Sequence, residues 1–434
     1  MNDSSHESPA SSAGLSRRGF LALTGAAIVG AGVGAGAYAG GINSGIIKGG
    51  TVQDLEHLEY DFYGAIQSGI VTPAQENMHF AALDLVDGVT REDLIELLRD
   101  WSYAANRMMM GLPVTAEGAF DGDPFSPPGD TGEAADHGPF GLTITFGFGK
   151  SLFETDDGTD RFGIKSQLPP ALAQPMPKML NDFIDPKISG GDICIQACAN
   201  DPQVAIHAIR NLTRIGFGKT SIRWSQIGFG RTSSTSKDQK TPRNLFGQKD
   251  GTNNIKAEEP EKLKENVWID EGPAWCKGGS YLVARKIYMT IEIWDGVRLE
   301  EQNRVLGRAK GSGAPLSGGD EFTTPDFSKK DGSGKTMIDD RSHVFRTHPD
   351  NNNGIHMLRR GYNYVDGNDE LGRLDAGLFF IAFVKSPDRF ATVHKNMARD
   401  DMFAEYLKTK SSSVFVVPPG IAEGEYVGAQ LFAV

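Results

Sequence analysis

Two stretches in different halves of the chain repeat the same order of local signals. Residues 193–212 and residues 378–397 each read as a buried strand followed by an amphipathic helix. Asp201-Pro202 and Ser386-Pro387 mark the junctions, with an N-cap residue and then a proline at the first helical position. This echo predicts two α+β halves of related design.

Other segments carry weaker local signals. Thr90 is predicted to cap a helix, with Asp93 three residues on and an apolar face that includes Leu94 and Trp101. Strand patterns lapse between residues 230 and 265, and we expect the two halves to meet there. The remaining predictions are strands over residues 80–85, 142–148 and 281–294 and exposed loops over residues 118–139 and 317–336.

The start of the chain predicts export. Residues 16–21, Ser-Arg-Arg-Gly-Phe-Leu, form a twin-arginine pattern, and a Gly/Ala-rich stretch leads to a small-residue cleavage site at Ala37-Tyr38-Ala39. An uncleaved membrane anchor is the alternative, but glycine and alanine gain little free energy in lipid compared with leucine and isoleucine. We therefore expect a signal peptide over residues 1–39, removed by cleavage before Gly40, and a periplasmic, extracellular or cell-envelope location.

Composition excludes several kinds of partner. The formal net charge of -12 argues against nucleic acid and anionic membrane as partners and favours cationic over anionic substrates. No stretch after the signal is long and apolar enough to span a bilayer, so no stable membrane insertion is expected after cleavage. Three cysteines, Cys194, Cys198 and Cys276, are too few for a disulfide framework and are interpreted as small buried side chains. A Cys-x-x-Cys-His motif is absent, so covalent c-type haem attachment is not expected.

Two polar stretches carry the chemistry. Residues 342–364 contain an imidazole, a Pro/Asn-rich turn and a twin arginine, and residues 247–251 read Gly-Gln-Lys-Asp-Gly. Together they resemble the dye-decolorising (DyP-type) haem peroxidase family, in its twin-arginine-exported, A-type or deferrochelatase-like branch. The resemblance covers most of the mature chain, including residues 191–212, 281–316 and 414–420.

This resemblance implies a fold and a cofactor. It implies an α+β protein of duplicated ferredoxin-like domains with antiparallel sheets, in which haem b is bound non-covalently in the C-terminal half. After the signal peptide, the predicted division is an N-terminal ferredoxin-like domain over residues 40–255 and a C-terminal, haem-binding ferredoxin-like domain over residues 256–434.

The resemblance also assigns a distal pair. Asp250 matches the aspartate of the family's Gly-x-x-Asp-Gly motif, and Arg359 matches the first arginine of its twin-arginine pair; Arg360 is the alternative, because adjacent residues of an extended chain point to opposite sides. Compound I formation needs a base for the proton of peroxide and a cation for the leaving oxygen, and Asp250 and Arg359 supply them. Gly251 is expected to let the backbone approach the macrocycle without a Cβ clash. Because aspartic acids have lower reference pKa values than histidine, an acidic optimum is expected.

Three histidines compete for the iron. His343 lies in the family's ligand context, six residues before Pro349, and is preferred over His348 and His356 as the axial ligand. A ligating imidazole usually donates its second N–H to an acceptor, and Asp401 occupies the position where relatives carry an acidic residue. Asp400 is the alternative acceptor.

The remaining assignments concern the pocket and its surroundings. Leu378 and Phe380 share one face of a strand and are expected to line the distal pocket, although ordinary core packing is nearly as economical. Arg285 and Arg308 are candidates for pairing with haem propionates. Because large donors cannot reach such a pocket, electrons are expected to travel from surface aromatics. The candidates are Tyr362, Tyr364 and Trp294, although ordinary packing is the expected role of each taken singly.

Three functions follow from these residues. The first is a peroxidase that uses hydrogen peroxide to oxidise dye-like or phenolic donors. The second is a deferrochelatase that releases iron from haem in an iron-uptake system, and the third is an exported haem carrier. Asp250 and Arg359 argue against a pure carrier, which needs no distal acid and cation. Besides peroxide and an organic donor, the implied partners are the twin-arginine export machinery and an iron-uptake or oxidase protein.

Overall fold

The computed structural model describes residues 52–179 and 181–433. The predicted signal peptide and the predicted start of the mature chain lie outside the described residues. In the part of the chain that is described, no helix is long and apolar enough to cross a bilayer.

The strands form one sheet that closes on itself. Its order is β5-β9-β2-β3-β1-β4-β7-β8-β6, and β5 also pairs with β8 along eight residues of each strand, so that the first eight strands make a ring. All these pairings are antiparallel. The bounds are β1 Asn77–Leu85, β2 Thr143–Gly149, β3 Ile193–Ala199, β4 Thr220–Arg231, β5 Ser280–Met289, β6 Leu358–Arg359, β7 Tyr362–Asn368, β8 Leu374–Val384 and β9 Leu407–Val417.

The ring consists of two units with the same strand order. In chain order, strands β1 to β4 lie as fourth, first, third, second, and strands β5, β7, β8 and β9 lie in the same order. This is the order of a ferredoxin-like unit, so the predicted duplication and fold class are confirmed. The two units join through short pairings of only two residue pairs each, β2 with β9 and β4 with β7.

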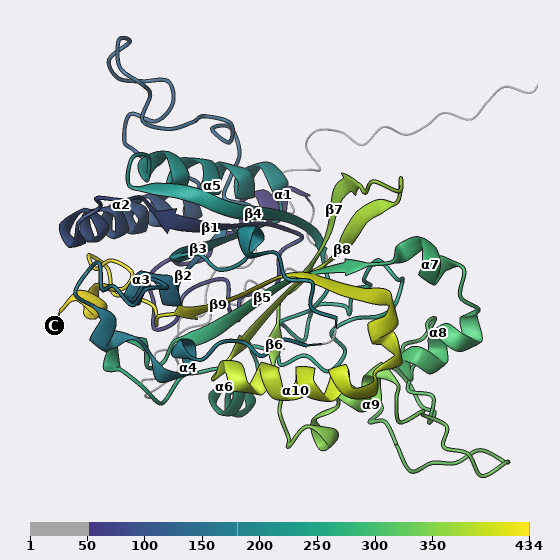
Figure 1. Cartoon of the computed structure of the whole chain (residues 1–434). Helices are drawn as coiled ribbons and strands as arrows, with labels where there is room; N and C mark the ends of the chain where they lie inside the picture. Colours follow the sequence, from purple (N-terminus) through teal and green to yellow (C-terminus); the bar gives the residue numbers. More distant parts are fainter. Residues whose placement is uncertain (1–51, 180, 434) are drawn as a thin grey trace, which may run out of the picture. The chain divides into compact units, whose positions relative to one another are not determined.

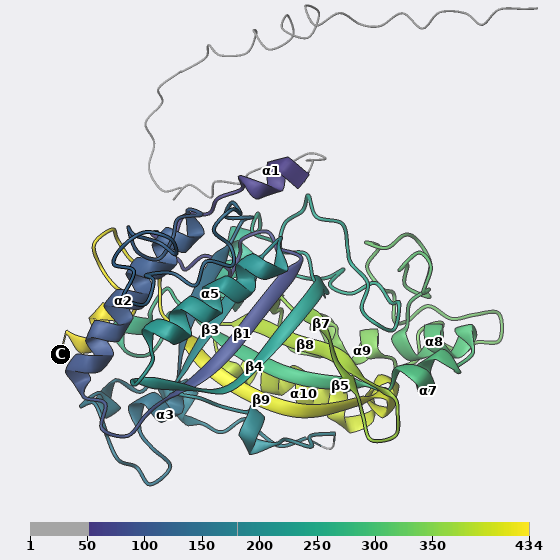
Figure 2. The same ribbon diagram turned by 90° about the horizontal axis from the view of Figure 1, so that it is seen from above.

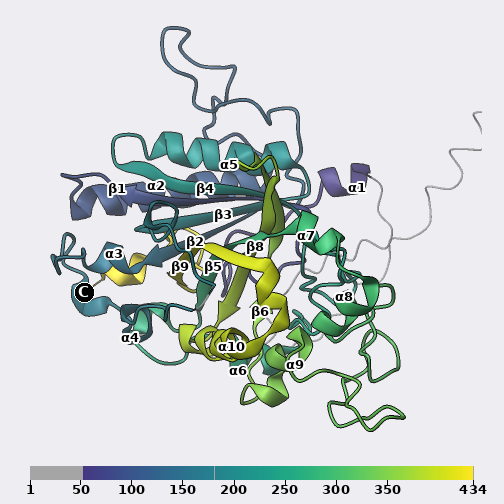
Figure 3. The same cartoon turned by 45° about the vertical axis from the view of Figure 1, so that its right-hand side comes forward.

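Helices cover the outer faces of the two sheets. Figures 1 and 3 show α2 and α5 outside the β1–β4 sheet and α10 outside the sheet of β5 and β8, and Figure 2 shows α2 and α5 lying over β1, β3 and β4. The α-helices are α1 Val52–Glu56, α2 Arg91–Met109, α3 Lys150–Phe153, α4 Pro170–Ala173, α5 Pro202–Ile215, α6 Pro260–Asn266, α7 Ile291–Asp295, α8 Leu299–Leu306, α9 His343–Thr347 and α10 Pro387–Asp400. Short 3₁₀ turns are η2 Lys165–Gln167, η3 Pro186–Ile188, η4 Ala274–Cys276, η5 Pro349–Asn351, η6 Met402–Tyr406 and η7 Ala429–Phe432.

The predicted caps start the three long helices. Thr90 and Asp93 form a complete capping box at α2. The Asp201 carboxylate accepts from the backbone N–H groups of Gln203 and Val204 at α5, and the Ser386 hydroxyl accepts from that of Asp388 at α10. The echo seen in the sequence is therefore two copies of one strand–cap–helix unit.

Alternate strand residues fill two separate cores. On β1, Met78, Phe80 and Ala82 face the space between the sheets, while Ala81 and Leu83 face α2 and α5. The ring of Phe80 lies 5.2 Å from that of Trp224 and 5.4 Å from that of Phe379, so the inter-sheet core joins both units. Burying an aromatic ring of this kind contributes roughly 1.5–3 kcal/mol. Cys194 and Cys198 belong to this core, and Cys276 is also buried; all three are free thiols, as predicted.

One strand was predicted too long. The strand expected over residues 281–294 ends at Met289, and residues 291–295 form α7. The apolar pattern of residues 291–294 is compatible with both a strand period of two residues and a helical period of 3.6. In the structure, Trp294 is buried while Ile293 is half exposed. Ile291 and Trp294, three residues apart, share one face of a helical turn, so the helical period decides the structure here.

His79 on β1 places a partly buried imidazole beside the sheet. Its Nδ1 is enclosed and lacks a hydrogen-bond partner among the described residues. Burial lowers the pKa of His79 from 6.5 to about 4. Because an unfolded histidine takes up its proton near pH 6.5, the unfolded chain binds more protons between pH 6.5 and 4, and the folded protein loses stability as the pH falls through that window.

We expect His79→Gln to remove this acid sensitivity. At its full extent the loss amounts to roughly 3 kcal/mol of unfolding free energy. Calorimetric melting temperatures between pH 7 and pH 4.5 should fall more steeply for the wild type than for the variant. Parallel pH profiles of the two proteins would contradict the assignment.

Candidate functional site

A cavity lies between the sheet of the second unit and the helices that cover it. Arg285 and Ile287 on β5 and Leu378 and Phe380 on β8 line it from the strand side. From the helical side it is lined by His343 and Val344 of α9 and by Phe390, Val393, His394, Met397 and Ala398 of α10. The turn around Asp250 and the side chains of Met179 and Asn181 complete the wall, and the next residue, Asp182, bridges to Thr409 of β9. The cavity therefore takes residues from both sequence halves.

Leu378 and Phe380 line the cavity because of strand alternation. Their neighbours Phe379 and Ile381 point to the opposite face and pack in the inter-sheet core. The ring of Phe380 lies 5.6 Å from that of Phe390, so an apolar contact bridges the strand and α10. The expected pocket position of Leu378 and Phe380 agrees with this geometry.

Asp250 and Arg359 meet at one end of the cavity. Arg359 Nη1 donates to Asp250 Oδ1 at 2.8 Å, and Asn244 Nδ2 donates to Asp250 Oδ2 at 3.2 Å. Asn254 holds the main chain of Arg359 from both sides: its Oδ1 accepts from the Arg359 N–H at 2.7 Å and its Nδ2 donates to the Arg359 carbonyl at 2.8 Å. Asn244 and Asn254 were not predicted from the sequence, although both belong to the same polar segment as Asp250.

The two adjacent arginines have different surroundings. Arg360 is fully buried, and its guanidinium donates to the Thr72 carbonyl, to Gln75 Oε1 and to Thr235 Oγ1 at 3.4 Å. Arg359 lines the cavity, whereas Arg360 does not. The geometry therefore supports Arg359 as the distal cation. Arg360 instead stabilises the fold through its hydrogen bonds to Thr72, Gln75 and Thr235.

Gly251 lines the cavity, but its need for glycine has another cause. Its φ is +83°, a left-handed conformation that favours glycine. A Cβ at this position would meet Ser233 Cα at 3.0 Å. The close approach that the structure shows is therefore to the protein main chain, and the approach of Gly251 to the macrocycle stays a prediction.

His343 is the first residue of α9 and is oriented by a buried carboxylate. Its Nδ1 lies 2.8 Å from Asp401 Oδ2, and the side chain of Asp401 is 0% exposed. Asp401 Oδ1 accepts from the Phe403 N–H at 2.9 Å, which fixes the carboxylate at the start of η6. Asp400 is 52% exposed and lies beside Arg341 and Arg346 instead. With Nδ1 engaged, Nε2 of His343 is the nitrogen available to a metal in the cavity.

His348 and His356 also line the cavity, without such a partner. His348 Nδ1 accepts from the Asp350 N–H at 3.3 Å, and its ring packs 5.1 Å from that of Phe327. The backbone N–H of His356 donates to Asn266 Oδ1 at 3.1 Å. Burial lowers the pKa of both imidazoles, which favours their neutral forms.

The two candidate propionate ligands are not equivalent. Arg285 is buried and forms an ion pair with Asp182, which also lies 3.7 Å from His394 Nε2. Arg308 Nη1 donates to the main-chain oxygens of Gly313 at 2.7 Å and Glu321 at 2.9 Å. Arg308 donates to neutral carbonyls, whereas Arg285 is paired with a carboxylate. The positive charge of Arg308 is therefore more available than that of Arg285 to pair with an anion in the cavity.

The three aromatics expected at the surface are all buried. Tyr362 and Tyr364 are 0% exposed in the inter-sheet core, and Trp294 is 0% exposed in a smaller core beside the cavity. The expectation of surface positions is therefore wrong, because strand alternation and the turn of α7 place these rings inward. Trp294 instead packs in an aromatic group with Phe246, Phe403 and Tyr406.

The cavity suits a flat, dianionic group with a metal at its centre. Among its lining residues, Asp250 is the single carboxylate, while Lys249, Arg285, Arg308 and Arg359 are cationic. Arg285 Nε on the wall is enclosed and lacks a hydrogen-bond partner among the described residues, as expected where a polar ligand completes the site. Apolar side chains on both faces and one oriented imidazole match the needs of haem.

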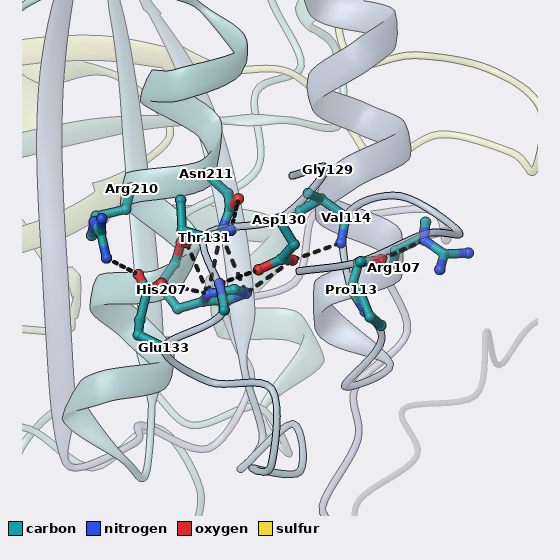
Figure 4. Close-up of polar contacts among 12 residues, drawn as sticks. Arg107, Pro113, Val114, Gly129, Asp130, Thr131, Glu133, His207, Arg210 and Asn211 are labelled. Carbon is teal, nitrogen blue, oxygen red and sulfur yellow. Dashed lines mark hydrogen bonds and ion pairs between the residues drawn. The ribbon is translucent and has the colours of Figure 1, made fainter. Parts of the chain in front are cut away.

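A second cavity lies beside α5 and contains none of the predicted site residues. Figure 4 shows His207 of α5 among Asp130, Thr131, Glu133 and Asn211. Its Nε2 lies 3.5 Å from Asp130 Oδ2 and its Nδ1 lies 3.6 Å from Glu133 Oε2, and the residue is 7% exposed. His207 is therefore a packed histidine of α5, and its contacts with Asp130 and Glu133 tie the 113–138 loop to the helix.

Known proteins resemble this chain along most of its length. The family model described as Dyp-type peroxidase, N-terminal, matches residues 67–230, and the one described as Dyp-type peroxidase, C-terminal, matches residues 241–422. A deferrochelatase of Escherichia coli K12 is 34% identical over 393 residues, which cover 88% of this chain and 89% of the relative.

Solved structures agree with these matches. DtpA from Streptomyces lividans, in an oxyferrous/water mixed complex, is 39% identical, with a TM-score of 0.80 and coverage of 88% of this chain and 100% of the other. A DyP-type peroxidase from Streptomyces coelicolor is 38% identical, with a TM-score of 0.80 and coverage of 89% and 100%.

Proposed function

Because the chain belongs to the Dyp-type peroxidase family, we propose that it oxidises phenolic or dye-like donors with hydrogen peroxide in the cavity between β5, β8 and α9, α10. It is a haem peroxidase, with haem b as its cofactor. The observation that carries the proposal is the pairing within one cavity of an oriented imidazole, His343 with Asp401, and a base with a cation, Asp250 with Arg359.

Haem supplies the redox-active iron when it is bound. His343 Nε2 would hold the iron while Asp401 keeps the ring in place and strengthens its basicity. Asp250 would accept a proton from hydrogen peroxide and deliver it to the departing oxygen, and Arg359 would stabilise the negative charge on that oxygen. Leu378 and Phe380 would exclude water from the reacting side.

Spectroscopy of the haem-loaded protein tests this proposal. A Soret band that changes on addition of one equivalent of peroxide and returns on addition of a phenolic donor is the expected result. A protein that binds no haem, or binds it without reacting with peroxide, would refute the peroxidase function.

A second candidate is favoured by the deferrochelatase of Escherichia coli K12, to which the chain is similar over 88% of its length. Iron release from haem would leave metal-free porphyrin, whose fluorescence is not quenched by iron. Incubation of the protein with haem and a reductant, without peroxide, distinguishes the two activities. Haem binding with neither turnover would point to the carrier.

We also propose that the two ferredoxin-like domains divide between residues 255 and 256.

The proposed location of the protein is outside the cytoplasm. Residues 1–39 would direct its export by the twin-arginine route. Replacement of Arg17 and Arg18 by lysine should retain the protein in the cytoplasm; unchanged export would contradict the signal.

An aromatic path leads from the axial histidine toward the surface. The ring of Phe403 lies 4.9 Å from that of His343, Trp294 lies 5.7 Å from Phe403, and Tyr406 lies 4.8 Å from Trp294. Tyr406 is partly exposed, unlike Trp294. Trp294 and Tyr406 can be oxidised one electron at a time, so they are the candidates that the structure favours for passing electrons from bulky donors.

We expect Trp294→Phe to slow oxidation of a bulky dye while the peroxide reaction keeps its rate, because phenylalanine keeps an aromatic ring in this core but resists oxidation. Tyr362→Phe, in the inter-sheet core, is the matched control and should leave dye turnover unchanged. Steady-state dye turnover and stopped-flow peroxide kinetics measure the two effects. If Trp294→Phe and Tyr406→Phe turn over the dye at the wild-type rate, electrons take another route.

A further inference from the structure

Gln248 presents an uncommitted amide at the cavity. The residue is 3% exposed and lines the cavity. Its Nε2 is enclosed, and no acceptor for it is found in residues 52–179 and 181–433. A buried amide donor without a partner costs free energy, so its position indicates an acceptor that the protein itself does not supply.

The main chain directs Gln248 to the same side as Asp250. Lys249 pairs with Arg243 in an antiparallel bridge, so the chain is extended at this point. Side chains two residues apart in an extended chain share a side. The ammonium group of the intervening Lys249 forms an ion pair with Glu321.

Asn244 forms hydrogen bonds with both Gln248 and Asp250 and so fixes their relative positions. Asn244 Oδ1 accepts from the Gln248 N–H at 3.3 Å, and Asn244 Nδ2 donates to the Asp250 carboxylate at 3.2 Å. The Asn244 N–H donates to the Gln248 carbonyl at 3.0 Å. A change in the position of Gln248 is therefore coupled to the position of the distal base.

We propose that Gln248 is a third distal group, whose carboxamide donates a hydrogen bond to the oxygen ligand placed between Asp250 and Arg359. This inference rests on the proposed peroxidase function. Arg359 already donates to Asp250 Oδ1, and an ionised Asp250 can only accept. Gln248 supplies a neutral donor that does not change its charge with pH, so it contributes to binding and orienting the oxygen and takes no proton from it.

Fluoride binding to the ferric, haem-loaded protein tests the proposal without turnover. Fluoride binds ferric iron and accepts hydrogen bonds from nearby donors. Gln248→Leu should raise the dissociation constant for fluoride by about tenfold, the loss expected for one hydrogen bond, and should shift the charge-transfer band of the fluoride complex. Gln174→Leu, the same change at an exposed glutamine that does not line the cavity, is the control and should leave both unchanged.

The measurements distinguish a failure of the role of Gln248 from a failure of the proposed peroxidase function. Equal fluoride affinity and band position in the wild type and Gln248→Leu would overturn the role of Gln248, while a slow peroxide reaction in Asp250→Asn would still support the proposed function. Absence of a Soret band in the wild type would instead remove the proposed function itself. If Gln248→Leu does not fold, Gln248→Met, which matches the length of glutamine without its amide, replaces it in the same comparison.

Discussion

His343→Ala is expected to lose the Soret band of the purified protein, or to shift it to that of haem with a weaker ligand. A buried carboxylate orients this imidazole, with Asp401 Oδ2 2.8 Å from its Nδ1. Its removal takes away the proposed protein bond to iron, while the apolar cavity walls remain to hold the macrocycle loosely.

The matched control is His348→Ala. His348 lines the same cavity and has a similar side chain, but it lacks the buried carboxylate. It should keep the wild-type Soret band and haem content. A normal spectrum in His343→Ala together with loss of haem in His348→Ala would move the axial ligand to His348. Asp401→Asn should lie between the wild type and His343→Ala: haem should stay bound, but its absorption spectrum should be altered.

Asp250→Asn and Arg359→Leu should keep haem and slow its reaction with hydrogen peroxide by about a hundredfold or more, the usual effect of removing a charge-stabilising group. Asparagine keeps the shape of Asp250 but cannot accept the proton. Leucine removes the positive charge while leaving the main-chain bonds of Asn254 to residue 359 available.

Stopped-flow mixing of each ferric variant with peroxide measures the rate. Soret intensity before mixing must match the wild type, so that a slow reaction is not mistaken for a loss of haem. If both variants react with peroxide as fast as the wild type, the distal assignment is wrong, and the base and the cation have to be sought elsewhere on the cavity wall.

Local signals in the sequence predicted most of the fold because they act over a few residues. Thr90, Asp201 and Ser386 cap their helices as expected, and the echoed strand–helix units occupy equivalent places in the two sheets. The error at Trp294 arose where two periods, of two and of 3.6 residues, fit the same short run. The packing of Trp294 against Phe246 and Phe403, which the sequence does not show, decides in favour of the helical period.

The site was harder to predict because side-chain direction in irregular chain depends on tertiary contacts. A motif could place Asp250 and Arg359, but the ion pair of Arg285 with Asp182 joins residues that no local pattern relates. The bracket that Asn254 forms around Arg359 likewise depends on how two distant segments meet. The inward positions of Tyr362 and Tyr364 follow from strand register, which the sequence alone did not fix.

The two copies of the folding unit have diverged in what lies under their helices. In the first copy, α2 runs for 19 residues and the ring of Trp101 stacks 5.9 Å from that of Phe146, so this helix packs directly on the sheet. In the second, short helices and irregular chain replace such a helix between β5 and β7, and a cavity remains. The two copies of one fold therefore do different work: the long helix of the first holds its sheet together, and the short helices of the second line the cavity that contains the predicted site residues.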